Sequence, residues 1–171
     1  MTLLHGDLVL LRTAVEADIP ALVRIRSTAA VLGRWPLADE SLEAELAADV
    51  AGQDGVEFLA VVVGGAVVGA VQWAAEDDPM YRHAGIDIYL DPAVHGRGIG
   101  TDAVRTLARH LVRELGHHRL VIDPAADNEP AIRCYAKVGF KPVGVMRQYE
   151  RAEDGTWHDG LLMDLLADEL T

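Results

Sequence analysis

The chain has 171 residues, of which 50% are hydrophobic and 25% are charged, so its length and composition suit one globular domain over residues 1–171. Its formal net charge of −12 makes nucleic acid and anionic membranes poor partners and attracts a cationic small molecule. The only cysteine, Cys134, has no partner for an internal disulfide, and the first residues carry no secretory signal. We therefore expect a cytoplasmic protein.

The first half of the chain predicts two helices and an antiparallel hairpin. Its most apolar stretch, from Phe58 to Val71, is shorter than the roughly 18 residues of a membrane span, and Gly64-Gly65 interrupts it. Two glycines between apolar runs are typical of a hairpin turn. The spacing of apolar residues predicts a strand over 6–13, helices over 16–30 and 39–52, and hairpin strands over 56–63 and 66–76.

The second half alternates strands and helices. Apolar residues at steps of four, beginning at Ile99, predict a long amphipathic helix that ends before Gly116. The other expected elements are strands over 84–91 and 118–128, a short helix over 130–138, and two strands around Asp154-Gly155. This mixture of hairpins and strand–helix–strand units predicts one α/β domain with a mixed sheet.

A glycine-rich loop, "HGRGIG" (His95–Gly100), opens the long helix. Alternating glycines let backbone N–H groups approach an anion, and a helix N-terminus adds a favourable dipole, so phosphate is the expected ligand. A P-loop is excluded because no Lys-Ser/Thr pair follows, and a dinucleotide fingerprint fits poorly because "PAVH" separates the loop from its strand. The loop by itself leaves open a helix start without a ligand.

A second motif follows: "NEPAIRCYAKVGF", from Asn128 to Phe140. With the glycine loop, which fits the acetyl-coenzyme A pyrophosphate pattern [Q/R]-x-x-G-x-[G/A] except at His95, it resembles the GNAT acetyltransferase superfamily. The resemblance covers most of the chain and is strongest from Ala84 to Phe140. It implies a single-domain GNAT fold, in which a mixed, mostly antiparallel sheet has splayed central strands and flanking helices.

The resemblance also implies acetyl-CoA as co-substrate, bound between the splayed strands, with no metal. The backbone of Ile88–Leu90 would pair with the pantetheine arm, and Tyr135 would protonate the departing thiolate. Cys134 is expected to pack inside its helix, without a covalent role. The implied cofactor-binding residues are Leu90, His95, Gly96, Arg97, Gly98, Ile99, Gly100, Thr101 and Asn128.

The identity of the acceptor is implied by a resemblance to one group of enzymes within the superfamily. "DPAADNEPAIRCYAKVGF" is similar to the matching segment of the aminoglycoside 6'-N-acetyltransferases, which implies a polycationic acceptor and a role in antibiotic resistance. Asp87 would contact the reacting amine as base or charge partner, Asp123 would bind another ammonium group, and Trp35 would form a stacking wall. Convergent carboxylates suit several ammonium groups.

Other interpretations stay open at this stage. The tail after Gly155 also resembles acetyltransferases of ribosomal proteins or peptide N-termini, and a non-catalytic acyl-CoA-binding module is a third alternative. Asp87 can be a costly buried strand residue, Asp123 a turn residue before Pro124, and Tyr135 a packed aromatic. The oligomeric state, a homodimer included, is not determined by the sequence.

Overall fold

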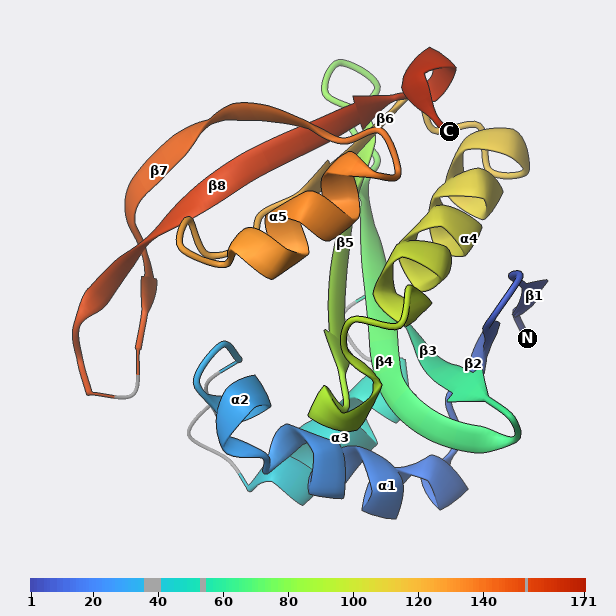
Figure 1. Cartoon of the computed structure of the whole chain (residues 1–171). Helices are drawn as coiled ribbons and strands as arrows, with labels where there is room; N and C mark the ends of the chain where they lie inside the picture. Colours follow the sequence, from blue (N-terminus) through green and yellow to red (C-terminus); the bar gives the residue numbers. More distant parts are fainter. Residues whose placement is uncertain (36–40, 53–54, 153) are drawn as a thin grey trace.

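The computed structural model describes residues 1–35, 41–52, 55–152 and 154–171. Within these ranges, eight strands form one sheet in the order β1-β2-β3-β4-β5-β6-β8-β7 (Figure 1). Only β5 and β6 pair in parallel, and the other neighbours are antiparallel. The predicted α/β fold with a mixed, mostly antiparallel sheet is therefore confirmed.

Each element closely follows a stretch of regular sequence pattern. The strands are β1 (Leu3–His5), β2 (Leu10–Thr13), β3 (Glu57–Val63), β4 (Ala66–Glu76), β5 (His83–Leu90), β6 (Arg119–Ile122), β7 (Lys141–Arg151) and β8 (Trp157–Leu166). The α-helices are α1 (Ile19–Arg26), α2 (Ala29–Leu32), α3 (Leu42–Val50), α4 (Ile99–Arg113) and α5 (Glu129–Ala136). In the described residues, no helix is both long and apolar enough to cross a membrane.

The predicted first strand over 6–13 is confirmed only for its second half, β2, because residues 6–9 form the turn of a hairpin between β1 and β2. The carboxylate of Asp102 in α4 accepts hydrogen bonds from the backbone N–H groups of Asp7, Leu8 and Val9, at 3.2, 2.7 and 3.0 Å. This buried side chain holds the turn from 93 to 95 residues away, so no local pattern predicts it.

The predicted helix over 16–30 is interrupted. A 3-10 turn (Glu16–Asp18) precedes α1, and the extended backbone of Thr28 separates α1 from α2. The hydroxyl of Ser27 donates to the carbonyl of Val23 at 2.7 Å, a local bond that competes with helix continuation. The first residues of the predicted helix over 39–52 lie outside the described residues, and α3 begins at Leu42 after the capping side chain of Ser41.

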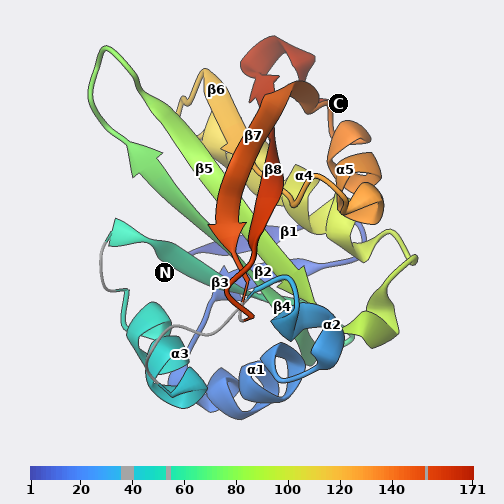
Figure 2. The same ribbon diagram turned by 90° about the vertical axis from the view of Figure 1, so that its left-hand side faces the viewer.

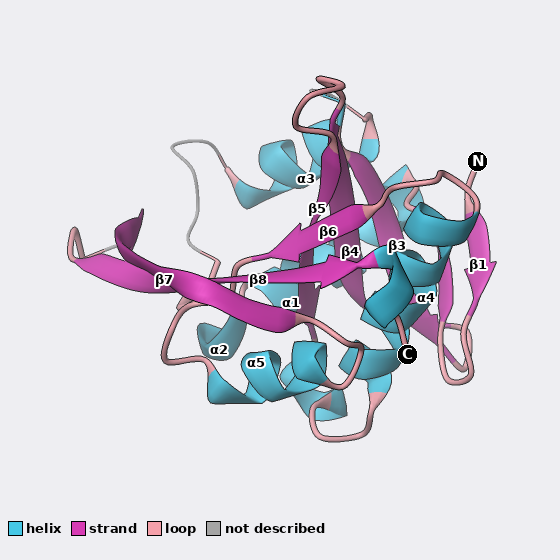
Figure 3. Ribbon diagram, turned by 90° about the horizontal axis from the view of Figure 1, so that it is seen from above, coloured by secondary structure: helices cyan, strands magenta, loops and turns pink. Residues whose placement is uncertain are grey.

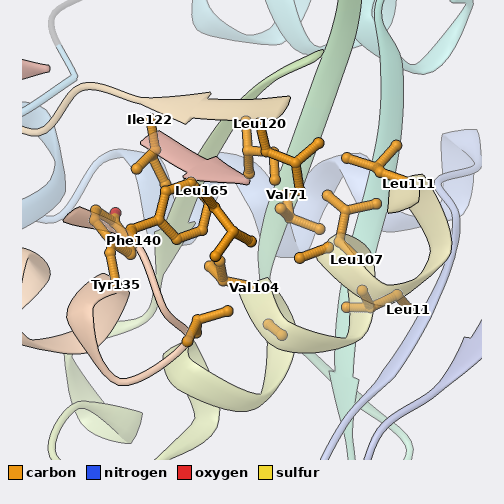
Figure 4. Packing of buried hydrophobic residues seen from close by; sticks show 14 of the residues in the cluster. Leu11, Val71, Val104, Leu107, Leu111, Leu120, Ile122, Tyr135, Phe140 and Leu165 are labelled. Carbon is orange, nitrogen blue, oxygen red and sulfur yellow. The ribbon is translucent and has the colours of Figure 1, made fainter. Parts of the chain in front are cut away.

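Helices cover both faces of the sheet and give it two cores. On one face Leu107 and Leu111 of α4 pack on Leu11 and Val71 of the strands (Figure 4). On the other face α1 and α3 supply Leu22, Ile25 and Leu46, which pack against Phe58 and Tyr89. Seen from above, α4 and α3 lie on opposite sides of the sheet (Figure 3), and α1 to α3 gather at one end of the molecule (Figure 2). The sheet is thus the middle layer of three.

The two parallel strands separate along their length. Pairing of β5 with β6 covers only Ala84 with Leu120 and Gly85 with Val121, whereas β5 continues to Leu90. The helix that connects them, α4, starts at the end where they have separated (Figure 1). Ligands in open α/β sheets bind beyond the carboxyl ends of the strands at such a separation. The opening predicted between the central strands is therefore present.

Candidate active site

A cavity of about 1090 Å³ occupies the space between the separated strands. Its walls come from β5, the first turn of α4, one face of α5, the loop after α2 and the outer part of β7. Arg97 of the glycine loop is exposed and does not line it. The other predicted site residues do: Trp35, Asp87, Leu90, His95, Gly96, Gly98, Ile99, Gly100, Thr101, Asp123, Asn128 and Tyr135.

One end of the cavity is bare backbone at the start of α4. Gly96 and Gly98 have φ angles of +71° and +80°, in the left-handed region that glycine adopts without strain. A Cβ atom added at Gly96 would meet nothing within 4 Å, so the loop is open to its surroundings. The first N–H groups of a helix lack intrahelical acceptors, and α4 has 15 residues. This end of the cavity fits the diphosphate of a nucleotide-linked thioester.

The free edge of β5 forms the side of the cavity. The N–H of Asp91 donates to the carbonyl of Val68 in line with the β4–β5 register, at 2.7 Å. Because antiparallel pairing alternates, Ile88 and Leu90 direct their N–H and C=O groups away from β4, towards the gap. The Nε2 atom of His95 lies 3.2 Å from the Leu90 carbonyl oxygen. The N–H group of Leu90, a predicted cofactor-binding residue, therefore faces the gap.

Two neighbouring side chains of α5 reach the cavity. Tyr135 is 7% exposed, and its ring packs edge-on against Phe140 with centroids 6.4 Å apart. Burial raises the pKa of its phenol, so the group stays protonated at neutral pH, as a general acid requires. Cys134 was expected to pack inside the helix, but its half-buried thiol lines the cavity, 3.3 Å from the Thr101 hydroxyl. Burial raises the pKa of that thiol.

Asn128, at the start of α5, has a structural role as the cap of that helix. The side-chain oxygen of Asn128 accepts from the N–H of Ala131 at 3.4 Å and caps the helix, and Pro130 follows in the first turn. Its amide N–H groups remain available on the cavity wall. Capping by its oxygen orients the amide, which is consistent with the predicted cofactor contact.

Carboxylates gather at the other end of the cavity. Asp87 of β5 is open to solvent through the cavity, yet protein surrounds it closely enough for burial to raise its pKa. The charges of Asp123 and Glu150 raise that pKa further, and the Gln72 amide, 3.4 Å away, lowers it. Burial and then Asp123 also raise the pKa of Glu150. Like charges in one partly desolvated site favour a cationic ligand.

Trp35 forms the wall beside this acidic end. Its ring meets Tyr89 edge-on with centroids 5.1 Å apart, and the Arg26 guanidinium lies 5.3 Å from the ring centroid. The Trp35 carbonyl accepts from Arg26 Nη1 at 2.6 Å. These contacts fix the indole of Trp35, which is half-buried and lies on a loop. The side chain lines the cavity, as a stacking wall requires.

Several cavity residues were not predicted from the sequence. Tyr149, Glu150 and Arg151 come from β7, and Gln72 comes from β4. The β7 sequence contains no motif, and its approach to β6 depends on an irregular register with β8. The acidic and aromatic character of "QYE" is the only local signal. Among the described residues, no group of three or more His, Cys, Asp or Glu side chains is placed to hold a metal.

Comparison with known proteins identifies the family. The acetyltransferase (GNAT) domain family matches residues 9–141. An aminoglycoside N(6')-acetyltransferase type 1 from Klebsiella pneumoniae is 30% identical over 160 residues, covering 82% of this chain and 78% of the relative.

Two solved structures share the fold. AAC(6')-Ib in complex with paromomycin and acetyl-CoA superposes with a TM-score of 0.77 at 26% identity, covering 95% of this chain and 96% of that one. RimJ from Mycobacterium smegmatis in complex with a CoA disulfide has a TM-score of 0.86 at 22% identity, covering 99% and 88%, and at that identity the likeness concerns the fold alone. From its family match and its relatives, the chain belongs to the GNAT family and is an acetyl-CoA-dependent N-acetyltransferase.

Proposed function

We propose that this enzyme transfers the acetyl group of acetyl-CoA directly to a primary amine of an aminoglycoside-like, polycationic acceptor. The observation that carries the proposal is that one cavity, of about 1090 Å³, extends from the bare start of α4 to a group of three carboxylates. An anionic donor suits the first end and a polycation suits the second. The two reactants would meet between them, beside Asp87 and Tyr135.

The cofactor side of the proposal uses backbone and one amide. The N–H groups from Gly96 to Thr101 would bind the diphosphate, and the exposed edge at Ile88 and Leu90 would pair with the pantetheine arm as an added strand. Asn128 would contribute its side-chain amide. Acetyl-CoA, when bound, supplies an activated acyl thioester. The N–H of Leu90 is directed to polarise its carbonyl.

The two side chains proposed for proton transfer have suitable pKa directions. An amine attacks only when uncharged, and a carboxylate near its usual pKa accepts a proton from an alkylammonium poorly. The raised pKa of Asp87 reduces that mismatch, so Asp87 is proposed to take the proton directly or through water. Tyr135, protonated and buried, is proposed to deliver a proton to the leaving thiolate.

The proposed acceptor is chosen from the negative charge of the protein and from its similarity to a relative of known activity. The formal net charge of −12 draws polycations toward the molecule, and Asp87, Asp123 and Glu150 provide local partners for ammonium groups. A relative 30% identical is an aminoglycoside N(6')-acetyltransferase. On this proposal the enzyme works in the cytoplasm, and acetylation of an aminoglycoside would give resistance to the drug.

An acceptor panel tests the proposal. Purified enzyme with acetyl-CoA is offered kanamycin, tobramycin, spermidine and short peptides with free N-termini, and release of the CoA thiol is followed. Turnover of the aminoglycosides at a kcat/KM at least tenfold above the peptides is expected. Turnover of peptides alone would overturn the acceptor and support an N-terminal acetyltransferase. Calorimetric binding of CoA without turnover of any acceptor would support a binding module.

A further inference from the structure

The β7 strand carries an irregularity at its approach to the cavity. Met146 pairs with Gly160 and Glu150 with His158, so residues 147–149 of β7 stand opposite Asp159 alone. Gln148, within this bulge, has a φ angle of +51°, which is uncommon outside glycine. Its N–H donates to the Asp159 carboxylate at 2.8 Å, which stabilises the unusual conformation. Bulges of this kind redirect side chains and occur beside active sites.

The bulge directs Tyr149 toward the end of β6. The Tyr149 ring lies on Gly160, where an added Cβ atom would be 2.8 Å from its Cδ1 atom, so only glycine leaves room for it. Its hydroxyl donates to the Oδ2 atom of Asp123, which links β7 to the carboxyl end of β6. Tyr149 is 50% exposed and lines the cavity, so this bond lies at the surface of the proposed acceptor site.

The hydrogen bond from Tyr149 occupies one oxygen atom of the Asp123 carboxylate. Its presence, together with burial, raises the pKa of Tyr149 to about 12, so the phenol remains a donor at neutral pH. The hydrogen bond from Tyr149 restricts rotation of the Asp123 carboxylate. The Oδ1 atom of Asp123 has no hydrogen-bond partner among the described residues. Glu150, adjacent along β7, also lines the cavity.

We infer that Tyr149 is a positioning residue that holds Asp123 ready for a second ammonium group of the acceptor, while the reacting amine lies at Asp87. The inference rests on the proposed function and narrows it to acceptors with two or more ammonium groups. One group neutralises Asp87, and the other is shared by Asp123 and Glu150. A monoamine leaves two of the three carboxylates unpaired, so it gains less from the site.

Replacement of one hydroxyl tests the inference. Tyr149→Phe keeps the ring on Gly160 and removes only the hydrogen bond. The Kd of tobramycin for the CoA-bound enzyme, measured by calorimetry, is expected to rise roughly tenfold, as for loss of a hydrogen bond to a charged group. In turnover, KM for tobramycin rises by a similar factor, and kcat and the KM of acetyl-CoA stay within about twofold. Tyr81→Phe, at a tyrosine 73% exposed that does not line the cavity, is the matched control.

A double-mutant cycle separates positioning from a general structural effect. In an Asp123→Asn background, Tyr149→Phe is expected to change the tobramycin Kd by less than about twofold, because its partner charge is already gone. An equal loss in both backgrounds, an unchanged Kd in the single variant, or no tobramycin binding by the parent would overturn the inference. Tobramycin binding that depends on Tyr149 without acetylation would support the inference and contradict the proposed function.

Discussion

Asp87 and Tyr135 reach the same cavity from different elements, and burial shifts both pKa values upward with opposite consequences. For the carboxyl group, a higher pKa makes the ionised form a better proton acceptor. For the phenol, a higher pKa keeps the group protonated at neutral pH, so a proton is present to be donated. The same physical cause thus makes one group a better proton acceptor and keeps the other in its protonated form.

Tyr135→Phe removes the proposed acid without removing the ring that packs on Phe140. We expect kcat to fall about a hundredfold, the lower range for loss of a general acid. The Kd of CoA measured by calorimetry should change by less than about twofold, because binding depends on backbone at α4 and β5. Tyr81→Phe is the control, and equal rates for the parent and Tyr135→Phe would exclude the acid role.

Asp87→Asn is expected to abolish most turnover and yet stabilise the fold at neutral pH. Because the pKa of Asp87 is raised above its ordinary value in the folded protein, the folded protein binds this proton more tightly than the unfolded chain. The contribution of Asp87 to stability is therefore fully present below that value and is lost as pH rises through the raised pKa. Asparagine does not titrate, so the variant gains stability relative to the parent as pH rises.

Thermal melts between about pH 4 and pH 8 measure this difference. At the highest pH of this range, the Tm of Asp87→Asn should exceed that of the parent, and the difference between the two Tm values should shrink as the pH falls. Glu114→Gln removes a charge at the far end of α4 and serves as the control. A Tm difference between Asp87→Asn and the parent that widened toward acid would contradict a raised pKa of Asp87 in the folded protein.

The α4 helix combines two tasks within its first turn. Its leading N–H groups face the cavity, whereas the buried Asp102 turns the other way and accepts three backbone hydrogen bonds from the β1–β2 turn. Gly6 in that turn has no space for a side chain, since a Cβ atom would lie 2.5 Å from both Asp102 Oδ2 and Thr106 Oγ1. The helix that forms the proposed cofactor site is therefore fastened to the first hairpin.

Asp102→Ala should lower the free energy of unfolding by about 3 kcal/mol, because the buried N–H of Val9 and the part-buried N–H groups of Asp7 and Leu8 lose their charged acceptor. Urea denaturation measures the change. Gly6→Ala should destabilise by about 2 kcal/mol through overpacking at the same contact. Gly144→Ala, where an added Cβ meets nothing within 4 Å, is its matched control. An Asp102→Ala variant as stable as the parent would mean that the turn is held by other contacts.

At the scale of the whole molecule, charge and shape act together. The surface carries a formal net charge of −12, while the cavity has an amide-lined end for an anion and a carboxylate end for a cation. Long-range attraction therefore favours the polycationic acceptor and opposes the anionic donor. On the proposed function, the donor is held by directed hydrogen bonds at close range, which the long-range electrostatic field of the protein does not supply.

Salt should affect the two substrates in opposite directions. Raising NaCl from about 0.05 M to 0.5 M is expected to lower kcat/KM for tobramycin about tenfold, because screening removes attraction to the negative surface. kcat/KM for acetyl-CoA should stay constant or rise. Initial rates at fixed pH measure both, with a neutral osmolyte as control. A salt-independent value for tobramycin would show that the overall charge plays no part in its capture.

The glycine-rich loop and the two helices beside it were predictable because their structure depends on local sequence. The glycines at 96 and 98, the capping residue Asn128 and the stepped apolar face of α4 each follow from a few neighbouring residues, and all lie where the sequence predicts. The acceptor half was predicted only in part. Asp87, Asp123 and Trp35 line the cavity as expected, but the contributions of Tyr149 and Glu150 were not predicted.

By itself the sequence determined the family, the α/β class, the order of most elements and the glycine-rich start of α4, since torsional preference and side-chain periodicity act over a few residues. Only the tertiary structure decided the first hairpin, the bulge at Gln148 and the meeting of Asp123 with Tyr149. These features depend on contacts between residues that are distant along the chain. Such contacts contribute free energy only after folding has brought the two residues together, so no local sequence pattern predicts them.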